Sequence, residues 1–343
     1  MKNKPKPGEK PTVKDVARRA GVSPSTVSRV ISNNPRISQA TRDKVLKEMQ
    51  VLEYQPNAIA RSLARSRTKI LGIVMPTRQE DVLMNPFFPE ALRGIVMAAA
   101  VSGYDVLLSA NLKTREELDV IRDFIGGGKV DGLILMGARE NDPNIQYLMA
   151  QDFPFSLIGS ASKRSINHVD NDNVAAAREL TKHILSTGKR NLCFVSGPLE
   201  LTVTRDRLQG FREALAEAGI TPKDHQIFTG EFNEATGAKI AGRIVENGSR
   251  PDAVVATDDV IAYGMFGTLT GLGYRIPEDI AIGSFNNSIL ARYTDAQLTS
   301  IDIKAFKLGQ QSVRQLQEAI EGGLRDSQEI IGHELIKRRS TVG

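Results

Sequence analysis

Apolar residues in the first fifty positions recur at helical spacing in three short segments. The first helix is predicted over residues 13–20, where apolar side chains follow the i, i+3, i+4, i+7 pattern of one face. Thr12 is a suitable N-cap for this helix, and Gly21 can adopt the left-handed conformation that ends it. A second helix is predicted to start at Ser23-Pro24, with Ser as N-cap and Pro at N1, and a third at Ser38.

The second helix presents polar groups on the face opposite its apolar residues. Its apolar positions 27, 30 and 31 share one side, which leaves Ser25, Thr26 and Arg29 pointing outward. Two short helices joined by a tight turn, with polar and basic groups exposed on the second, are typical of a helix-turn-helix DNA reader.

From residue 70 onward the pattern changes to short apolar runs that alternate with helical segments. The runs include ILGIV, DGLILM, NLCFV, DAVVA and DIAIG, and the helices between them include residues 114–125, 173–186 and 204–218. Repeated β-α units predict parallel sheets in doubly wound domains. Because the strands are too many for one small sheet, we expect two lobes with a ligand cleft beyond the strand ends.

The charge of the 343-residue chain is divided between its two parts. The net charge of +5 is the sum of +11 for residues 1–69 and −6 for the remainder. A basic head on an acidic body is what local binding to phosphates requires. No apolar run approaches the roughly 18 residues of a membrane helix, and the basic N-terminus leads into no signal-peptide core, so we expect a cytoplasmic protein without a membrane partner.

The candidate chemistry of the body does not indicate catalysis. The four histidines are scattered without metal-ligand spacing, and Gly126-Gly127-Gly128-Lys129 lacks the Ser/Thr of a phosphate loop. Acidic residues do occur at predicted strand ends, where sugar hydroxyl binding, loop capping and acid-base chemistry are the alternatives; they are Asp170, Asp172, Asp258 and Asp259. We expect no catalytic residue, no metal and no cofactor.

Over nearly its whole length the sequence resembles the LacI/GalR family of bacterial repressors. The resemblance is carried by TVKDVARRAGVSPSTVSRVISNNPRISQATRDKV, by YQPNAIARSLA and by LTSIDI with the final HELIKRRST. Within the family, NPFFPEALRGI, ARENDP, VDNDN and FNN most resemble maltose-operon repressors of Gram-positive bacteria. The implied fold is an all-α helix-turn-helix head followed by an α/β core of two doubly wound lobes like those of periplasmic binding proteins.

The resemblance implies the domain boundaries. It predicts a DNA-binding domain over 11–55, a hinge helix and linker over 56–69, and an effector-binding and dimerisation core over 70–343. The core lobes are expected at 70–170 with 302–332 and at 171–301 with 333–343.

The resemblance also implies a homodimer on operator DNA. Pro24, Ser25 and Arg29 match base-reading positions, next to the outward-facing Thr26, and Arg29 has the chemistry to pair with guanine. Leu63, in the hinge helix that begins at Asn57, matches a leucine wedged into the minor groove. Phosphate contacts are expected at Thr12, Ser32, Arg36 and Ser38, because helix N-caps suit that task.

For the core, the resemblance implies a pocket for a small effector. Arg207 matches an effector-binding arginine, and Phe87, Phe88 and Phe232 match aromatic positions that line the pocket. The acidic pair usual near residue 286 is replaced by Asn286-Asn287, which can still bind hydroxyl groups. The expected effector residues are Phe87, Phe88, Asp170, Arg207, Phe232, Asp258 and Asn286.

The sequence therefore predicts a repressor of carbohydrate genes that is relieved by a sugar such as maltose or another α-glucoside. A global carbon-catabolite regulator that uses a phosphorylated carrier protein as corepressor is the alternative. A sugar-binding or transport module and a sugar-processing enzyme are alternatives of other classes.

Overall fold

The computed structural model describes residues 11–54, 67–76, 82–109, 116–160, 166–221, 226–246, 251–323 and 326–342. The chain forms two compact units, the head up to Ile70 with the short loop 128–131, and the remaining core. Each unit is described by itself. Among the described residues, no helix is long and apolar enough to cross a membrane.

Three helices form the described part of the head, as the sequence predicts. They are α1 (Val13–Ala20), α2 (Pro24–Ile31) and α3 (Gln39–Val51). Gly21 ends α1 in the left-handed conformation with a φ of 63°. The small core that the three helices share consists of Val16, Ala17, Ala20, Val27, Val30 and Val45.

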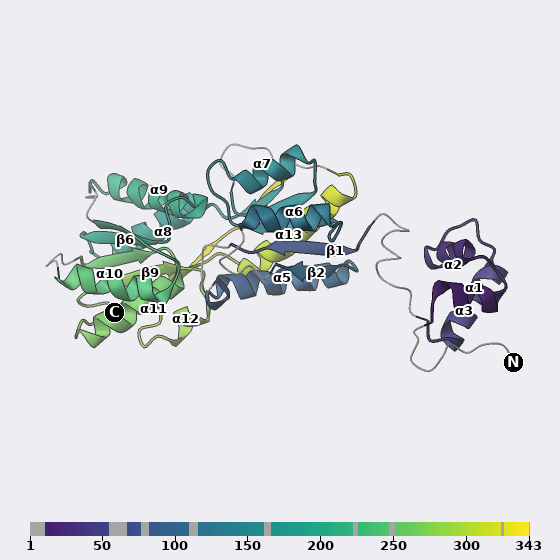
Figure 1. Ribbon diagram of the computed structural model, residues 1–343. Coiled ribbons are helices and arrows are strands. Elements are labelled where there is room, and N and C mark those ends of the chain that lie inside the picture. The colour runs from purple at the N-terminus through teal and green to yellow at the C-terminus, as the bar shows by residue number, and fades with distance from the viewer. Residues whose placement is uncertain are drawn as a thin grey trace. The chain divides into compact units, whose positions relative to one another are not determined.

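The first lobe of the core is built on a six-stranded sheet. Its helices α5 (Phe87–Val101) and α13 (Ala305–Ile320) pack on one face, and α6 (Glu117–Gly126) and α7 (Pro143–Ala150) lie on the other (Figure 1). A Cβ atom at Gly94 would come 2.0 Å from the carbonyl oxygen of Phe306, so glycine lets α5 and α13 touch. The strand order is β11 (Gln328–Ile330), β5 (His168–Asp170), β4 (Phe155–Ile158), β3 (Gly132–Met136), β1 (Ile70–Val74) and β2 (Asp105–Leu108).

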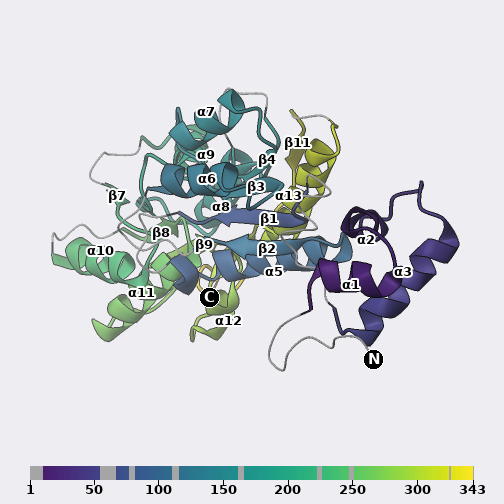
Figure 2. The ribbon, with the colours of Figure 1, turned by 45° about the vertical axis from the view of Figure 1, so that its right-hand side comes forward.

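The second lobe repeats this plan. Helices α8 (Asn173–Ser186) and α9 (Thr202–Glu217) pair with each other, as do α10 (Glu234–Glu246) and α11 (Asp259–Gly271), and the two pairs cover opposite faces (Figure 2). The strand order is β12 (Glu334–Ile336), β10 (Thr299–Asp302), β9 (Ala281–Phe285), β8 (Ala253–Ala256), β6 (Leu192–Ser196) and β7 (Ile227–Thr229). The described part of the core also contains two short helices, η1 (Val82–Met84) in the first lobe and α12 (Ile289–Tyr293) in the second.

The chain passes between the two sheets three times, after β5, after β10 and between β11 and β12. The buried side chain of Asn171 joins these crossings, because its Nδ2 donates to the carbonyl oxygens of Ile303 at 3.1 Å and of Ile331 at 2.7 Å. The lobe boundaries expected from the sequence stay a prediction.

The predicted fold class is confirmed, with differences at element ends. Helix α6 begins at Glu117 rather than at residue 114, and α9 begins at Thr202 rather than at 204. The second sheet is not wholly parallel, because β12 pairs antiparallel with β10. The predicted hinge helix falls mostly on residues 55–66, which lie outside the described residues.

Candidate functional site

The exposed face of α2 is organised by its N-cap. The hydroxyl oxygen of Ser23 accepts from the backbone N–H of Thr26 at 3.1 Å, and it lies 2.7 Å from the Ser25 hydroxyl. Ser25 is exposed, whereas Thr26 is partly buried and its hydroxyl lies 2.9 Å from that of Ser23. The hydroxyl groups of Ser25 and Thr26 therefore both lie within hydrogen-bonding distance of the Ser23 hydroxyl.

Arg29 is exposed on the same helix. Two other arginines of the head are paired, since Arg19 binds Glu48 at 2.7 Å and Arg18 lies 3.4 Å from Asp15. No described residue pairs with the Arg29 guanidinium. The fold thus leaves this side chain available for an external acceptor.

The predicted phosphate-binding residues do not all occupy the positions expected of them. Thr12 and Ser38 are the N-caps of α1 and α3. Ser32 is the C-cap of α2 and its hydroxyl donates to the carbonyl oxygen of Arg29, so the N-cap argument fails for this residue. Arg36 is exposed in the following turn, and Asn57 and Leu63 lie outside the described residues.

A cavity of about 340 Å³ opens between the two lobes of the core. Its size lies at the lower end of the roughly 300–1,000 Å³ of small-molecule sites. All seven side chains that the sequence predicts for the effector line this cavity: Phe87, Phe88, Asp170, Arg207, Phe232, Asp258 and Asn286. Their shared location is a structural fact, whereas their role in binding stays a prediction.

One side of the cavity carries a buried carboxylate and a buried guanidinium joined by an amide. Asn173 donates from Nδ2 to Asp170 Oδ1 at 3.0 Å and accepts from Arg207 Nε at 2.9 Å. Arg207 also donates to the carbonyl oxygen of Thr257 and packs 4.2 Å from the ring centre of Phe285. Asp170 Oδ2 has no hydrogen-bond partner among the described residues.

A second carboxylate lies where the lobes meet. Asp258 is the N-cap of α11, and its Oδ2 accepts from Asn85 of the first lobe at 2.8 Å and from Asn286 at 2.9 Å. The family resemblance suggested that acidic charge was lost at position 286. Asparagine does stand at this position, and the Asp258 carboxylate lies directly beside it, so an acidic group is present next to Asn286.

Burial governs the ionisation of these groups. It raises the pKa of Asp170 to about 7, against the opposing effects of the Asn171 N–H and Arg207. It also raises the pKa of Asp258 to about 6 and lowers the pKa of Arg207 to about 10. The site therefore holds a guanidinium beside two buried carboxyl groups whose pKa values lie closer to neutral pH than those of exposed aspartates.

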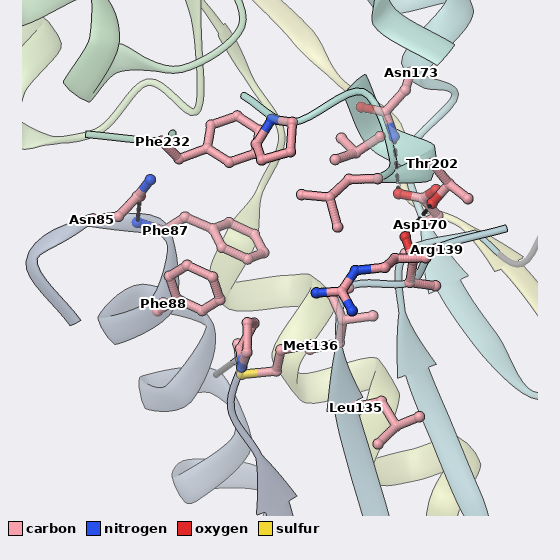
Figure 3. A pocket seen from close by; sticks show the side chains of 18 of the residues that line it. Asn85, Phe87, Phe88, Leu135, Met136, Arg139, Asp170, Asn173, Thr202 and Phe232 are labelled. Atoms are coloured by element: carbon pink, nitrogen blue, oxygen red, sulfur yellow. Dashed lines mark hydrogen bonds between the residues drawn. The ribbon is translucent and has the colours of Figure 1, made fainter. Parts of the chain in front are cut away.

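Aromatic rings form the apolar wall of the cavity (Figure 3). Phe87 and Phe88 start α5 and meet edge to face with their ring centres 5.1 Å apart. Phe232 enters from the second lobe and packs on Gly197, where a Cβ atom would come 2.4 Å from the ring. Flat apolar faces beside hydroxyl-binding groups suit the mixed surface of a sugar ring.

Sequence reasoning missed several polar residues of the cavity, among them Asn85, Arg139 and Asn173. Asn85 and Arg139 fall in the quoted segments NPFFPEALRGI and ARENDP, but single residues were not assigned there. Among the described residues no group of His, Cys, Asp or Glu could hold a metal ion. Asp172 and Asp258 are the N-caps of α8 and α11, a role that the sequence reasoning did not assign to them.

Comparison with known proteins identifies both parts of the chain. Residues 12–57 match the model of bacterial regulatory proteins of the lacI family, and residues 181–341 match a periplasmic binding protein-like domain. The HTH-type transcriptional regulator MalR of Streptococcus pneumoniae is 35% identical over 333 residues, covering 95% of this chain and 99% of that protein. Catabolite control protein A of Priestia megaterium is 31% identical over 334 residues, 96% of this chain and 99% of that protein.

A solved structure agrees over almost the whole chain. The transcriptional regulator CelR in complex with cellobiose superposes with a TM-score of 0.75 at 28% identity, covering 96% of this chain and 99% of that one. These relatives are all transcriptional regulators. From its head, its two-lobed core and these matches, the chain belongs to the LacI family of bacterial transcriptional regulators.

Proposed function

We propose that this protein is a cytoplasmic repressor of carbohydrate-utilisation genes whose operator binding is relieved by maltose or a related α-glucoside. The observation that carries the proposal is the cavity between the lobes, where buried carboxyl and amide groups face three phenyl rings. Carboxylates and amides bind sugar hydroxyls, and phenyl faces pack on sugar C–H groups. The relationship to MalR supports maltose as the effector.

Operator reading is assigned to the head. Arg29 contacts guanine from the exposed face of α2, Pro24, Ser25 and Thr26 lie nearby, and the caps Thr12 and Ser38 meet phosphates. Leu63 enters the minor groove in this proposal. A homodimer presents two heads to the half-sites of a pseudo-palindrome.

An apolar strip on the core supports the dimer. Val96, Met97 and Val101 on α5 are 50%, 52% and 90% exposed. Contiguous apolar side chains on the surface of a soluble protein are typical of an interaction site. A second copy of the chain would bury this strip.

A binding assay tests the proposed function. A duplex that the full-length protein selects from a randomised pool is labelled, and its fluorescence anisotropy is followed as maltose, cellobiose, trehalose or glucose is added. Maltose is expected to release the selected duplex at concentrations that leave weak binding to random DNA unchanged. Release by none of the sugars would contradict the proposal.

The carbon-catabolite alternative is favoured by the 31% identity with catabolite control protein A. In that case a phosphorylated carrier protein, rather than a sugar, changes the affinity for DNA. Calorimetric titration with maltose and, separately, with a serine-phosphorylated carrier protein distinguishes the two. Heat only from the carrier protein would favour the alternative.

A further inference from the structure

Arg139 occupies a point of contact between the two lobes. It follows β3, and its backbone forms an antiparallel bridge with Leu201 of the second lobe. Its N–H donates to Asp142 Oδ2 at 3.3 Å, and the preceding Ala138 accepts from the Thr202 N–H at 3.1 Å. The backbone of Arg139 is therefore held from both sides of the cavity.

The side chain of Arg139 projects into the cavity toward the side from which Phe87 and Phe88 enter (Figure 3). Its guanidinium makes no hydrogen bond or ion pair with any described residue. The neighbouring acids already have other partners. Asp142 accepts backbone N–H groups, Glu140 pairs with Arg205, and Glu117 accepts from Asn144 at 2.8 Å.

The charge of the cavity limits what this guanidinium can bind. Among the residues that the structure describes, two basic residues line it, Arg139 and Arg207. The acidic residues of the lining outnumber them and are Glu117, Asp142, Asp170, Glu200, Glu231 and Asp258. An anionic ligand would meet this excess of carboxyl groups, whereas a neutral ligand with many hydroxyl oxygens would not.

We propose that Arg139 is a specificity-determining residue that donates paired hydrogen bonds to two neighbouring hydroxyl oxygens of a neutral sugar. The inference rests on the proposed sugar effector and assigns a recognition role to one further side chain. The planar guanidinium presents donors in a fixed fork, which matches two adjacent oxygens on one ring. Because both lobes hold its backbone, Arg139 reads a sugar enclosed between them.

Calorimetric titration of the full-length protein with maltose tests this assignment. Arg139→Ala is expected to weaken maltose binding by about 10- to 100-fold, the usual effect of losing charged hydrogen bonds to a ligand. Arg139→Lys keeps the charge but not the fork, and it should give an intermediate loss. The control Arg212→Ala removes an exposed arginine on α9, outside the cavity, and should leave the affinity within about twofold.

Two further measurements test whether Arg139→Ala acts through ligand binding rather than through stability, and whether the ligand is neutral. The melting temperature without sugar should be the same for Arg139→Ala and the unmodified protein, because the guanidinium has no described partner to lose. Maltobionate, which carries a carboxylate, should bind more weakly than maltose. Tighter binding of maltobionate, or equal maltose affinity after Arg139→Ala, would overturn the assignment.

The effector itself is checked first with maltose, cellobiose, trehalose and glucose. If another neutral sugar binds and maltose does not, the maltose proposal fails, while Arg139 is tested with the sugar that binds. If none of these sugars binds a protein that still binds its selected duplex, both the sugar effector and the role of Arg139 are wrong.

Discussion

Arg29 is the residue on which the reading of DNA depends in our proposal. Its guanidinium is exposed and unpaired among the described residues, unlike that of Arg19. A two-pronged contact with guanine is worth about 1–3 kcal/mol. Arg29→Ala should therefore weaken binding to the selected duplex by about tenfold or more, with little change on scrambled DNA. The control is Arg18→Ala on α1. If Arg29→Ala lowered the affinity for the selected and the scrambled duplex by the same factor, the proposed contact with a base would be contradicted.

Asp170 is expected to make stability depend on pH. Folding raises its pKa from the ordinary 3.8 to about 7, so the folded protein keeps a proton that the unfolded chain has released. The contribution of this group to stability therefore falls as the pH rises from about 4 to about 7. The amide of an Asp170→Asn variant cannot ionise. The melting temperature of that variant relative to the unmodified protein should therefore increase between pH 5 and pH 8.

The control for this pH dependence is Asp172→Asn. Asp172 is exposed and caps α8 through the Ala175 N–H at 2.8 Å, a contact that an asparagine side chain also makes. The test is whether the change with pH is larger for Asp170→Asn than for this exposed neighbour. Equal changes for the two variants would mean that Asp170 does not keep its proton.

Residues with a strong local or family signal were predictable, and residues defined by long-range contacts were not. Arg207 and the three phenylalanines were assigned to the cavity from the motifs around them. Asn85 was missed because its significance comes from Asp258, 173 positions later in the chain. Ser32 was misplaced because the sequence shows that a helix ends nearby but not on which side of the end the residue lies.

At the scale of elements, the hydrophobic pattern located most strands of the two sheets, but not the direction of the last one. The segment HELIKRRST was matched to the family, yet β12 pairs antiparallel with β10. Direction depends on the path of the connecting chain, which here returns between the lobes. The predicted starts of α6 and α9 similarly differ from the observed starts by a few residues, because the side chains near these starts suit either a loop or a first helical turn.

Asn171 should be the most sensitive single residue of the connection between the lobes. Its amide serves two buried carbonyl groups from the other crossings. Asn171→Ala leaves both carbonyl oxygens without this donor and should lower the free energy of unfolding by about 2 kcal/mol or more. Asn171→Asp, which offers no donor when ionised, should be at least as destabilising. Chemical denaturation at pH 8 measures both, and a loss below about 0.5 kcal/mol would contradict this role.

At the scale of the whole molecule, the proposed function requires the two binding sites to affect each other equally. If maltose lowers operator affinity by a given factor, the operator must lower maltose affinity by the same factor. Titrating maltose into the free protein and into its complex with the selected duplex measures this factor. A random duplex at equal concentration is the control, and identical maltose affinity in both states would exclude coupling.

The three crossings between the lobes also bear on how the protein is made. The first sheet receives β11, and the helix pair α5–α13 is completed, only after the strands and helices of the second lobe from α8 to β10 have been synthesised. The three described helices of the head, in contrast, follow one another in the sequence and precede the whole core along the chain. Domains generally fold as units during synthesis, with the N-terminal one first. In a nascent chain the three helices of the head can thus fold before the last strands of the core have been synthesised. The cavity that is proposed to regulate DNA binding is complete only after those strands.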